Sequence, residues 1–214
     1  MAENSELYDA VLNGDAKKAV AATRQALETG ADPLELVQRH MVPAMDEVGR
    51  RFECEDYFVP ELLLAARAMK GSLELIRPLL TQLGAEPAGR VVIGTVKGDL
   101  HDIGKNIVAS MLEGGGFEVI DLGSDVAPDK FVAAVKERNA NMVCLSALLT
   151  VTMPSMKTTI DALSAAGLRA RVKVLVGGAP VTQKFAEQIG ADGYGENAVA
   201  AVALARKLVV QPVP

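Results

Sequence analysis

The chain has 214 residues, of which 22 are lysine or arginine and 27 are aspartate or glutamate, so its formal net charge is −5. Half of the residues are hydrophobic, which excludes general disorder, and the net acidity argues against a nucleic-acid binder. Two cysteines, Cys54 and Cys144, are too few for a disulfide framework and suit a reducing compartment. The polar start carries no signal-peptide pattern, and no apolar run reaches the roughly 20 residues of a spanning helix, so we expect a cytoplasmic protein.

Residues 1–84 show helical periodicity almost throughout and predict a four-helix bundle. The first apolar pattern at helical spacing runs on to Gly30. Pro43 is expected to kink or restart the helix that contains it, and Pro60 to open the last helix. Residues 85–89 are rich in Gly, Ala and Pro and form a linker by composition.

Over residues 90–214 the pattern alternates between short apolar strands and helices. The expected strands are 91–96, 117–120, 142–145, 172–176 and 193–194. Strands that are apolar throughout and separated by helices predict a parallel sheet covered on both faces. Five such units suit the flavodoxin-like (Rossmann-like) doubly wound order 2-1-3-4-5, an α/β fold in which ligands bind beyond strands 1 and 3. That rule directs attention to the loops 97–105 and 146–154.

One of the only two histidines in the chain, His101, lies in the first of these loops. An imidazole there can ligate a metal while Asp99 or Asp102 holds its other nitrogen, although a solvated histidine beside a capping aspartate is the commoner arrangement. Gly104 would let a ligand approach the backbone at the start of the next helix. The other histidine, His40, is in the helical half, so no zinc-like ligand set is present. A single protein ligand is enough only where a macrocycle supplies the rest, which points to haem or a corrinoid.

Three motifs follow strands 1, 3 and 4 in order. They are Asp99-x-His101-x-x-Gly104, Ser146-x-Leu148 and Gly177-Gly178. In this order they resemble the signature of proteins that bind cobalamin with its own base displaced by a histidine (base-off/His-on). The resemblance implies that His101 is the lower axial ligand of cobalt and that Asp99 hydrogen-bonds to it.

The same resemblance assigns roles to further residues. Ser146 and Thr150 would line a slot for the nucleotide tail, and Gly177 and Gly178 would leave room for it. In methionine synthase a serine completes the hydrogen-bonded chain from the histidine, and Thr152 stands at the matching position with a hydroxyl for a proton relay. The other residues implied to contact the cofactor are Gly98, Asp102, Ile103, Gly104, Leu148 and Ala198.

The helical half resembles the cap domain of cobalamin-dependent methionine synthase on residues 45–52 and 57–61. It is still more similar to the small corrinoid proteins of methanol, methylamine and aryl-ether methyltransferase systems. In those proteins the cap covers the upper face of the corrin and shields the cobalt–methyl bond. The resemblance therefore makes Phe58 and Leu62 candidates for that contact.

The function implied is that of a methyl carrier, not catalytic alone. Cobalamin or a related corrinoid would alternate between methylcob(III)alamin and cob(I)alamin. It would take the methyl group from a substrate-specific methyltransferase and give it to an acceptor methyltransferase that uses tetrahydrofolate or coenzyme M. A corrinoid-reactivating protein is the third implied partner, and neither nucleic acid nor membrane is expected. Methanol, methylamines, glycine betaine and aryl methyl ethers all remain open as donors.

Four other functions share features with this one. A cobalamin-based regulator also joins a helical cap to this fold but usually adds a DNA-binding domain. The small subunit of a cobalamin mutase would carry the same histidine motif but needs a barrel for radical chemistry. A flavodoxin-like carrier needs a hydroxyl-rich phosphate loop, whereas residues 97–104 contain no Ser or Thr. A phospho-receiver would place an aspartate where strand 3 ends in Ser146.

Overall fold

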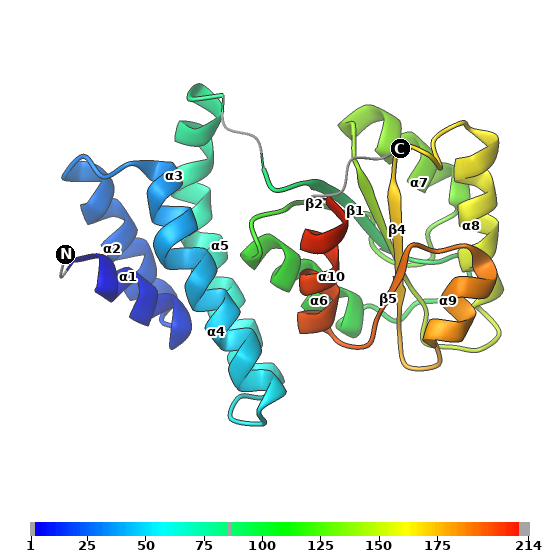
Figure 1. Cartoon of the computed structure of the whole chain (residues 1–214), viewed down its shortest axis with the longest axis horizontal. Helices are drawn as coiled ribbons and strands as arrows, with labels where there is room; N and C mark the ends of the chain where they lie inside the picture. Colours follow the sequence, from blue (N-terminus) through cyan, green and yellow to red (C-terminus); the bar gives the residue numbers. More distant parts are fainter. Residues whose placement is uncertain (1–2, 85–86, 210–214) are drawn as a thin grey trace. The chain divides into compact units, whose positions relative to one another are not determined.

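The computed structural model describes residues 3–84 and 87–209 and divides into two compact units (Figure 1). One unit holds the N-terminal helices together with residues 110–116, and the other holds a sheet and the helices that cover it. The expected linker, 85–89, includes residues 85–86, which lie outside the described residues. None of the helices within the described ranges combines the length and the apolar character needed to cross a membrane.

The N-terminal unit is built from helices in sequence order. They are α1 (Glu3–Leu12), α2 (Ala16–Glu28), α3 (Pro33–Leu36), the π-helical turn η1 (Val37–Met41), α4 (Val42–Glu53) and α5 (Val59–Gln82). The long helix α5 packs on α2 and α4. Its buried residues recur at helical spacing, so that one stripe of α5 faces the interior of the unit. That stripe contains Leu62, Ala65, Met69, Leu73 and Ile76.

The periodicity that runs on to Gly30 belongs to two helices and not to one. Gly14 breaks it, with a φ of +69°, and a Cβ at this position would lie 2.5 Å from the Cβ of Leu64 on α5. A glycine is therefore required both by the backbone and by the neighbouring helix. Asp15 then accepts a hydrogen bond from the Lys18 N–H at 3.0 Å and caps α2.

The chain stays helical around Pro43, but its helix type changes there: the π-helical turn η1 ends at Met41 and α4 begins at Val42, with Pro43 in its first turn. The N–H of Val42 bonds to the carbonyl of Val37, five residues back, at the end of η1. A proline inside an α-helix lacks its own N–H and clashes with the carbonyl four residues earlier. The wider π turn accommodates the missing N–H and the bulk of the proline ring. As a result, α3, η1 and α4 follow one another without a non-helical residue between them.

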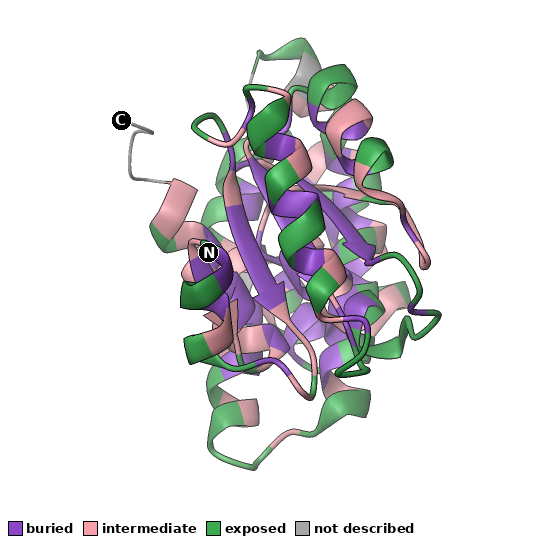
Figure 2. Ribbon diagram, turned by 90° about the vertical axis from the view of Figure 1, so that its right-hand side faces the viewer, coloured by how far each residue is buried: buried purple, intermediate pink, exposed green. Residues whose placement is uncertain are grey.

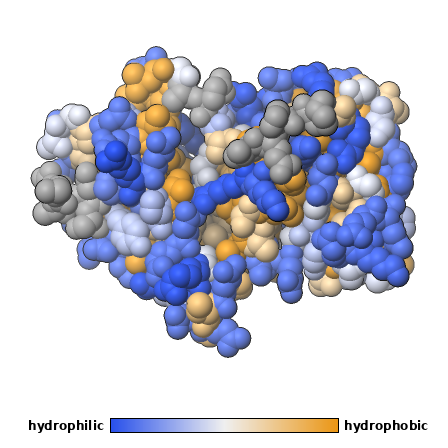
Figure 3. Space-filling model, viewed as in Figure 1, coloured by the Kyte–Doolittle hydropathy of each residue, from blue (hydrophilic) through white to orange (hydrophobic). Residues whose placement is uncertain are grey.

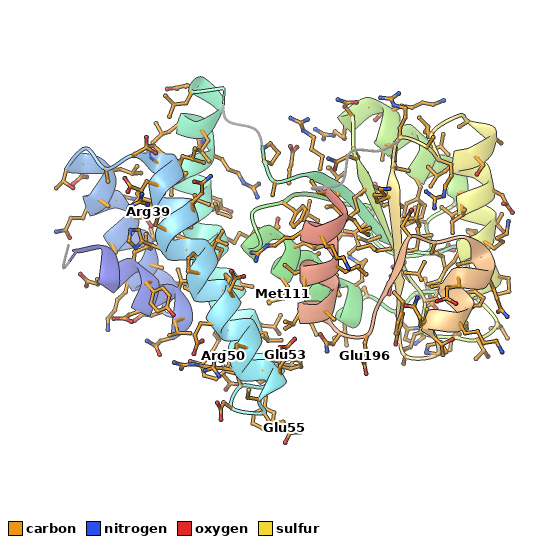
Figure 4. All side chains as sticks on the ribbon, viewed as in Figure 1. Arg39, Arg50, Glu53, Glu55, Met111 and Glu196 are labelled. Carbon is orange, nitrogen blue, oxygen red and sulfur yellow. The ribbon has the colours of Figure 1, made fainter. Side chains whose placement is uncertain are left out.

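A charged cluster holds the turn between α4 and α5. Glu47 accepts hydrogen bonds from Arg50, near the end of α4 in Figure 4, and from Arg51. Hydrogen bonds from both guanidinium groups lower the pKa of Glu47 to about 2. Arg51 also lies over the ring of Tyr57 and donates to its hydroxyl at 3.0 Å. The cluster thereby fixes the backbone that leads into Phe58.

The second unit is a five-stranded parallel sheet in the order β2-β1-β3-β4-β5. Its strands are β1 (Arg90–Thr95), β2 (Glu118–Asp121), β3 (Met142–Ser146), β4 (Lys173–Gly177) and β5 (Gly193–Gly195). The helices that follow its strands are α6 (Ile103–Gly114), α7 (Pro128–Arg138), α8 (Pro154–Ala165), α9 (Gln183–Ile189) and α10 (Ala198–Val209), and the last residues of α6, 110–114, group with the N-terminal unit. The predicted doubly wound α/β sheet and its strand order are confirmed.

Burial is concentrated along the strands and on the sides of the helices that face them (Figure 2). On one face, Phe131 of α7 and Met156 of α8 pack with Val92 and Val143 in a shared core. Each large side chain buried in this way contributes about 1.5–3 kcal/mol to folding. A Cβ on Gly94 would lie 2.8 Å from the Phe131 ring, so this glycine lets α7 pack directly on β1.

The register of the strands sets the edge where a ligand can bind. Thr95 at the end of β1 pairs with Ser146 at the end of β3, and Ser146 pairs with Gly177 at the end of β4. The loops that leave these three strands therefore start side by side at one edge of the sheet.

Candidate functional site

Asp99 joins the β1–α6 loop to the β3–α8 loop. Its side chain is completely buried, and one carboxylate oxygen, Oδ1, accepts from the backbone N–H of His101 at 3.1 Å. The other oxygen, Oδ2, accepts from the backbone N–H groups of Leu148 and Leu149 at 2.8 and 3.2 Å. It also accepts from the hydroxyl of Thr152 at 2.7 Å. A buried carboxylate is tolerated here because hydrogen-bond donors from both loops surround it.

The ionisation of Asp99 fixes the tautomer of His101. Burial raises the pKa of the Asp99 carboxyl, but hydrogen bonds from the Thr152 hydroxyl, the Leu148 N–H and His101 outweigh it and hold that pKa well below its usual value. At neutral pH the carboxylate can only accept, so His101 Nδ1, 2.7 Å from Oδ1, carries the proton and donates it. The side chain of His101 is half exposed, and Nε2 is the ring nitrogen that the bond to Asp99 leaves for a ligand.

A hydrogen bond from β1 also fixes the backbone at His101. Thr95, which is fully buried at the end of β1, donates its hydroxyl to the His101 carbonyl at 2.8 Å. Asp102, the second aspartate considered from the sequence, is exposed, and its carbonyl accepts from the Asn106 N–H in the first turn of α6. The structure thus brings Asp99, and not Asp102, to the imidazole.

The two loops also display exposed apolar side chains beside the histidine. These residues are 41–80% exposed, and they are Leu100, Ile103, Leu148, Leu149 and Val151. By contrast, the surface over α9 is largely hydrophilic (Figure 3). Several exposed apolar side chains on two neighbouring loops favour a binding surface, because their burial by a ligand is favourable.

Three of the glycines expected to contact the cofactor have different surroundings, so a side chain would be excluded at some of these positions and not at others. Gly178 has a φ of +129°, and a Cβ there would lie 1.9 Å from the carbonyl oxygen of Ala147. The contact between the loops that follow β3 and β4 therefore requires glycine whether or not a ligand is bound. Gly177 is tight against the Gly195 carbonyl, with a Cβ distance of 3.1 Å. Gly104 is the opposite case, because a Cβ there would meet no atom within 4 Å and the start of α6 is open.

The remaining expected cofactor contacts lie at the same edge of the sheet or close to it. Ser146 is the last residue of β3, and Thr150 is exposed in the β3–α8 loop. Gly98, with a φ of +88°, immediately precedes Asp99. Ala198 is buried at the first position of α10, two residues after Glu196 (Figure 4).

In the helical unit the two proposed cap residues differ. Phe58 is 62% exposed, immediately before α5 begins. Leu62 is only 1% exposed and lies on the stripe of α5 that faces the interior of the unit. Its burial is that of a core residue of the helical unit, and of the two cap candidates only Phe58 is exposed.

Lys105 is a site neighbour that sequence reasoning missed. Its side chain is 2% exposed, and Nζ donates to Asn106 Oδ1 at 2.6 Å and to the carboxylate of Asp121 at the end of β2. A buried ammonium group needs such partners, and here they tie the first turn of α6 to the sheet. A lysine near the start of a helix ordinarily indicates an exposed position, so no sequence signal points to this role.

The donor set fits a metal that brings most of its own ligands. Among the described residues, no group of three His, Cys, Asp or Glu could hold a metal ion. A metal bound by His101 Nε2 would therefore take a single protein ligand at this edge, which suits a metal held in a macrocycle and does not suit an ordinary zinc site. The exposed apolar side chains around it suit the face of a large ring.

Comparison with protein families gives two matches to families described as B12 binding domain, one over residues 89–203 and one over residues 4–77. Dimethylamine corrinoid protein 1 of Methanosarcina acetivorans is 45% identical over 194 residues, which cover 90% of this chain and 91% of that protein. Trimethylamine corrinoid protein 2 of Methanosarcina mazei is 47% identical over 191 residues, 88% of each chain.

Solved structures give the same result. A cobalamin-binding protein from Desulfitobacterium hafniense DCB-2 is 34% identical with a TM-score of 0.78, covering 96% of this chain and 97% of its own. The methanol:cobalamin methyltransferase complex MtaBC from Methanosarcina barkeri contains a chain that is 30% identical with a TM-score of 0.87. That match covers 99% of this chain and 81% of the other.

Proposed function

The chain belongs to the family of B12-binding corrinoid proteins, and we propose that it carries a methyl group on cobalamin held base-off with His101 as the lower axial ligand. Cobalamin is the cofactor of this family, and its cobalt, when bound, accepts a methyl group from one reactant and releases it to another. The observation that carries the proposal is the hydrogen bond from His101 Nδ1 to the buried Asp99, which leaves Nε2 available at the edge of the sheet.

The residues of the chain prepare this ligand. Asp99 holds the imidazole in the Nδ1–H tautomer and in one orientation, so little conformational freedom is lost when Nε2 binds a metal. Thr152, Leu148 and Leu149 supply the donors that keep the Asp99 carboxylate ionised in its buried position. Partners of this kind outside the ligand shell typically change metal affinity about 10–100-fold.

The surroundings of His101 would complete the binding site. Ser146 and Thr150 would contact the nucleotide tail, and the open backbone at Gly104 would lie against the ring. The exposed apolar side chains of the two loops would be covered by the cofactor, which removes them from water. Phe58 remains our candidate for a contact from the helical cap, because it is the exposed aromatic at the start of α5.

We assign the cap to residues 1–84, the cofactor-binding domain to residues 90–214 and the linker to residues 85–89. The two B12-binding matches, over 4–77 and 89–203, support this division. The carrier needs a donor methyltransferase and an acceptor methyltransferase, with a reactivating protein as a further partner. The names of the relatives support a methylamine as the methyl donor, and the acceptor would use tetrahydrofolate or coenzyme M.

Electron paramagnetic resonance tests the axial ligand. The protein, grown with [¹⁵N]histidine, is loaded with cobalamin and reduced to the paramagnetic cobalt(II) state. If His101 is the ligand, the nitrogen splitting changes from the triplet of ¹⁴N to the doublet of ¹⁵N. His101→Ala should lose the doublet, and the matched control His40→Ala should keep it. A triplet in the labelled protein, or no uptake of corrinoid, would reject the assignment.

A second experiment tests the carrier role. Methylated holoprotein is mixed with acceptor methyltransferases of the two types, and demethylated holoprotein with donor enzymes for dimethylamine, trimethylamine and methanol. We expect transfer with a methylamine enzyme, and His101→Ala should transfer far more slowly. The carrier proposal fails if cobalamin binds through His101 but no donor or acceptor enzyme exchanges a methyl group with it.

A further inference from the structure

Asp125, in the loop between β2 and α7, contacts the three consecutive residues that end with Asp99. Its Oδ1 accepts from the backbone N–H of Gly98 at 2.8 Å, and its carboxylate also pairs with Lys97 Nζ at 3.0 Å. Its own backbone N–H donates to the Asp99 carbonyl at 2.8 Å. One residue thus holds the short segment that leads directly to His101.

The backbone at this contact is strained. Asp125 has a φ of +55° and is not a glycine, and Gly98 opposite it has a φ of +88°. A non-glycine residue in the left-handed region costs about 1 kcal/mol or more and persists where the surrounding contacts compensate for it. Aspartate is better suited to this conformation than most residues, because its short side chain can hydrogen-bond to nearby backbone. The strain is therefore retained together with a specific set of contacts.

We propose that Asp125 is a positioning residue that fixes the backbone of Gly98 and Asp99 so that the buried carboxylate faces His101 Nδ1. This inference rests on the proposed function of His101 as an axial ligand. The contacts of Asp125 within the described residues reach neither the imidazole nor the Asp99 carboxylate, so it acts through the backbone. Without it, the Asp99 carboxylate and the imidazole would no longer be held in one arrangement.

The bond to the Gly98 N–H is the important one among these contacts. Lys97 and Asp125 are both substantially exposed, with side chains 57% and 40% accessible, and ion pairs of this kind contribute little. A backbone N–H that donates to a carboxylate makes a stronger, charge-assisted bond. The Gly98 N–H and then the Lys97 ammonium hold the pKa of Asp125 below its usual value, so the acceptor is ionised at neutral pH.

Three substitutions separate these contributions. Asp125→Gly removes both side-chain bonds and leaves a residue that adopts positive φ without strain, so the variant should fold. Asp125→Asn keeps an acceptor for the Gly98 N–H and tolerates the left-handed conformation, but it loses the charge that pairs with Lys97. Lys97→Met removes the ion pair alone.

Asp192 provides a matched control at the other end of the sheet. Its Oδ2 accepts from the Val174 N–H at 2.6 Å and pairs with Arg169 at 2.8 Å, which repeats the combination of one backbone donor and one cation. Val174 lies near the start of β4, away from the loops that carry His101. Asp192→Gly should therefore lower stability without affecting the imidazole.

The first readout needs no cofactor. Nitrogen NMR of the [¹⁵N]histidine apoprotein distinguishes a fixed Nδ1–H tautomer from an average of the two tautomers, and His101→Ala identifies which of the two histidine signals is His101. We expect the fixed tautomer in the wild type, Lys97→Met, Asp125→Asn and Asp192→Gly, and averaging in Asp125→Gly. A lower melting temperature in Asp125→Gly with an unchanged His101 signal would overturn the proposal and leave Asp125 a purely structural role.

The second readout is ligation in the holoprotein, measured from the visible spectrum. Asp125→Gly should reduce the equilibrium constant for binding of the imidazole to cobalt about ten-fold, the lower end of the range for groups outside the ligand shell. If Asp125→Gly fails to fold, Asp125→Asn tests the proposal in its place. This variant keeps the acceptor for the Gly98 N–H, so an averaged His101 signal in it would contradict the role given to that bond. If His101 proves not to be the ligand, the proposed function fails, while the apoprotein NMR still decides the positioning role.

Discussion

The hydroxyl of Thr152 donates to Asp99 across 53 positions of sequence, with Thr152 Oγ1 and Asp99 Oδ2 2.7 Å apart. The other oxygen of the same carboxylate holds His101 Nδ1 at the same distance. The buried Asp99 carboxylate therefore connects the β3–α8 loop to the imidazole, and a change to it should affect both the stability of the fold and the orientation of His101.

Replacing Thr152 with valine keeps the shape of the side chain and removes the donor. We expect Thr152→Val to lower the free energy of unfolding of the apoprotein by about 1.5–3 kcal/mol, the range for hydrogen bonds to charged groups. Thr152→Ser should retain most of the stability. The control is Thr159→Val, because Thr159 is also buried but its hydroxyl bonds to the Ser155 carbonyl of its own helix and to no carboxylate, whereas that of Thr152 reaches both Asp99 and the Leu149 carbonyl. Urea denaturation measures all three, and equal losses at Thr152 and Thr159 would contradict the special role of the carboxylate.

The lowered pKa of Asp99 makes stability depend on pH in acid. The folded-state pKa lies below the ordinary value of 3.8, so the unfolded chain binds the proton more readily. The stabilisation from this group is complete above about pH 3.8 and is lost as the pH falls from there towards the folded-state pKa. Asp99→Asn should be less stable than the wild type at pH 7, and the gap should narrow in acid. A gap that is constant between about pH 7 and pH 2.5 would show that the ionised carboxylate is not the stabilising form.

Two glycines at the site should respond to alanine in opposite ways. Gly178→Ala places a Cβ 1.9 Å from the Ala147 carbonyl oxygen at positive φ, and we expect it to cost about 3 kcal/mol or more. Gly104→Ala meets no atom within 4 Å and should raise stability by up to about 1 kcal/mol, because alanine favours helix. Yet Gly104→Ala should weaken cobalamin binding. Thermal melting and cobalamin titration separate the two effects, and undiminished binding by Gly104→Ala would remove this glycine from the site.

The two cysteines should differ in reactivity. Burial raises the pKa of the Cys144 thiol to about 12, so almost none of it is thiolate at pH 8, and it is enclosed in β3. Cys54 is exposed. A thiol reagent at pH 8 should therefore modify one cysteine quickly in the folded protein and two in urea, and Cys54→Ser should remove the fast reaction. Fast modification of Cys144 in folded Cys54→Ser protein would show that β3 opens readily.

The sheet was predictable because β1, β3 and β4 have continuous apolar, buried centres and the strands are separated by helical segments, a combination that fits a parallel sheet covered on both faces. The helical half was harder to delimit. Gly14 interrupts a continuous apolar period, and only the close approach of Leu64 shows why a break is needed there. Pro43 predicts a kink or a restart, but the sequence does not reveal the π turn η1 that precedes α4.

The centre of the site was predictable for a topological reason. Loops that follow neighbouring parallel strands meet at one edge, so residues 97–105 and 146–154 could be grouped from their order in the chain, whereas Thr152 was singled out only by the resemblance to methionine synthase. The sequence could not distinguish Leu62 from Phe58 as cap candidates, because apolar residues on a helix look alike until the buried face is known. Asp125 and Thr95 were missed because they act through backbone atoms, which leave no residue pattern at a fixed spacing.

The Asp99 carboxylate, which is bonded to both loops, also limits how the site can be engineered. A designer who wished to move this histidine onto another parallel sheet would have to transplant residues 97–105 and 146–154 as a pair, because neither loop alone supplies both the acid and its donors. Shortening or lengthening either loop by one residue would displace the imidazole, and the loop that follows β2 carries Asp125, so new specificity is better introduced in the loop that follows β5.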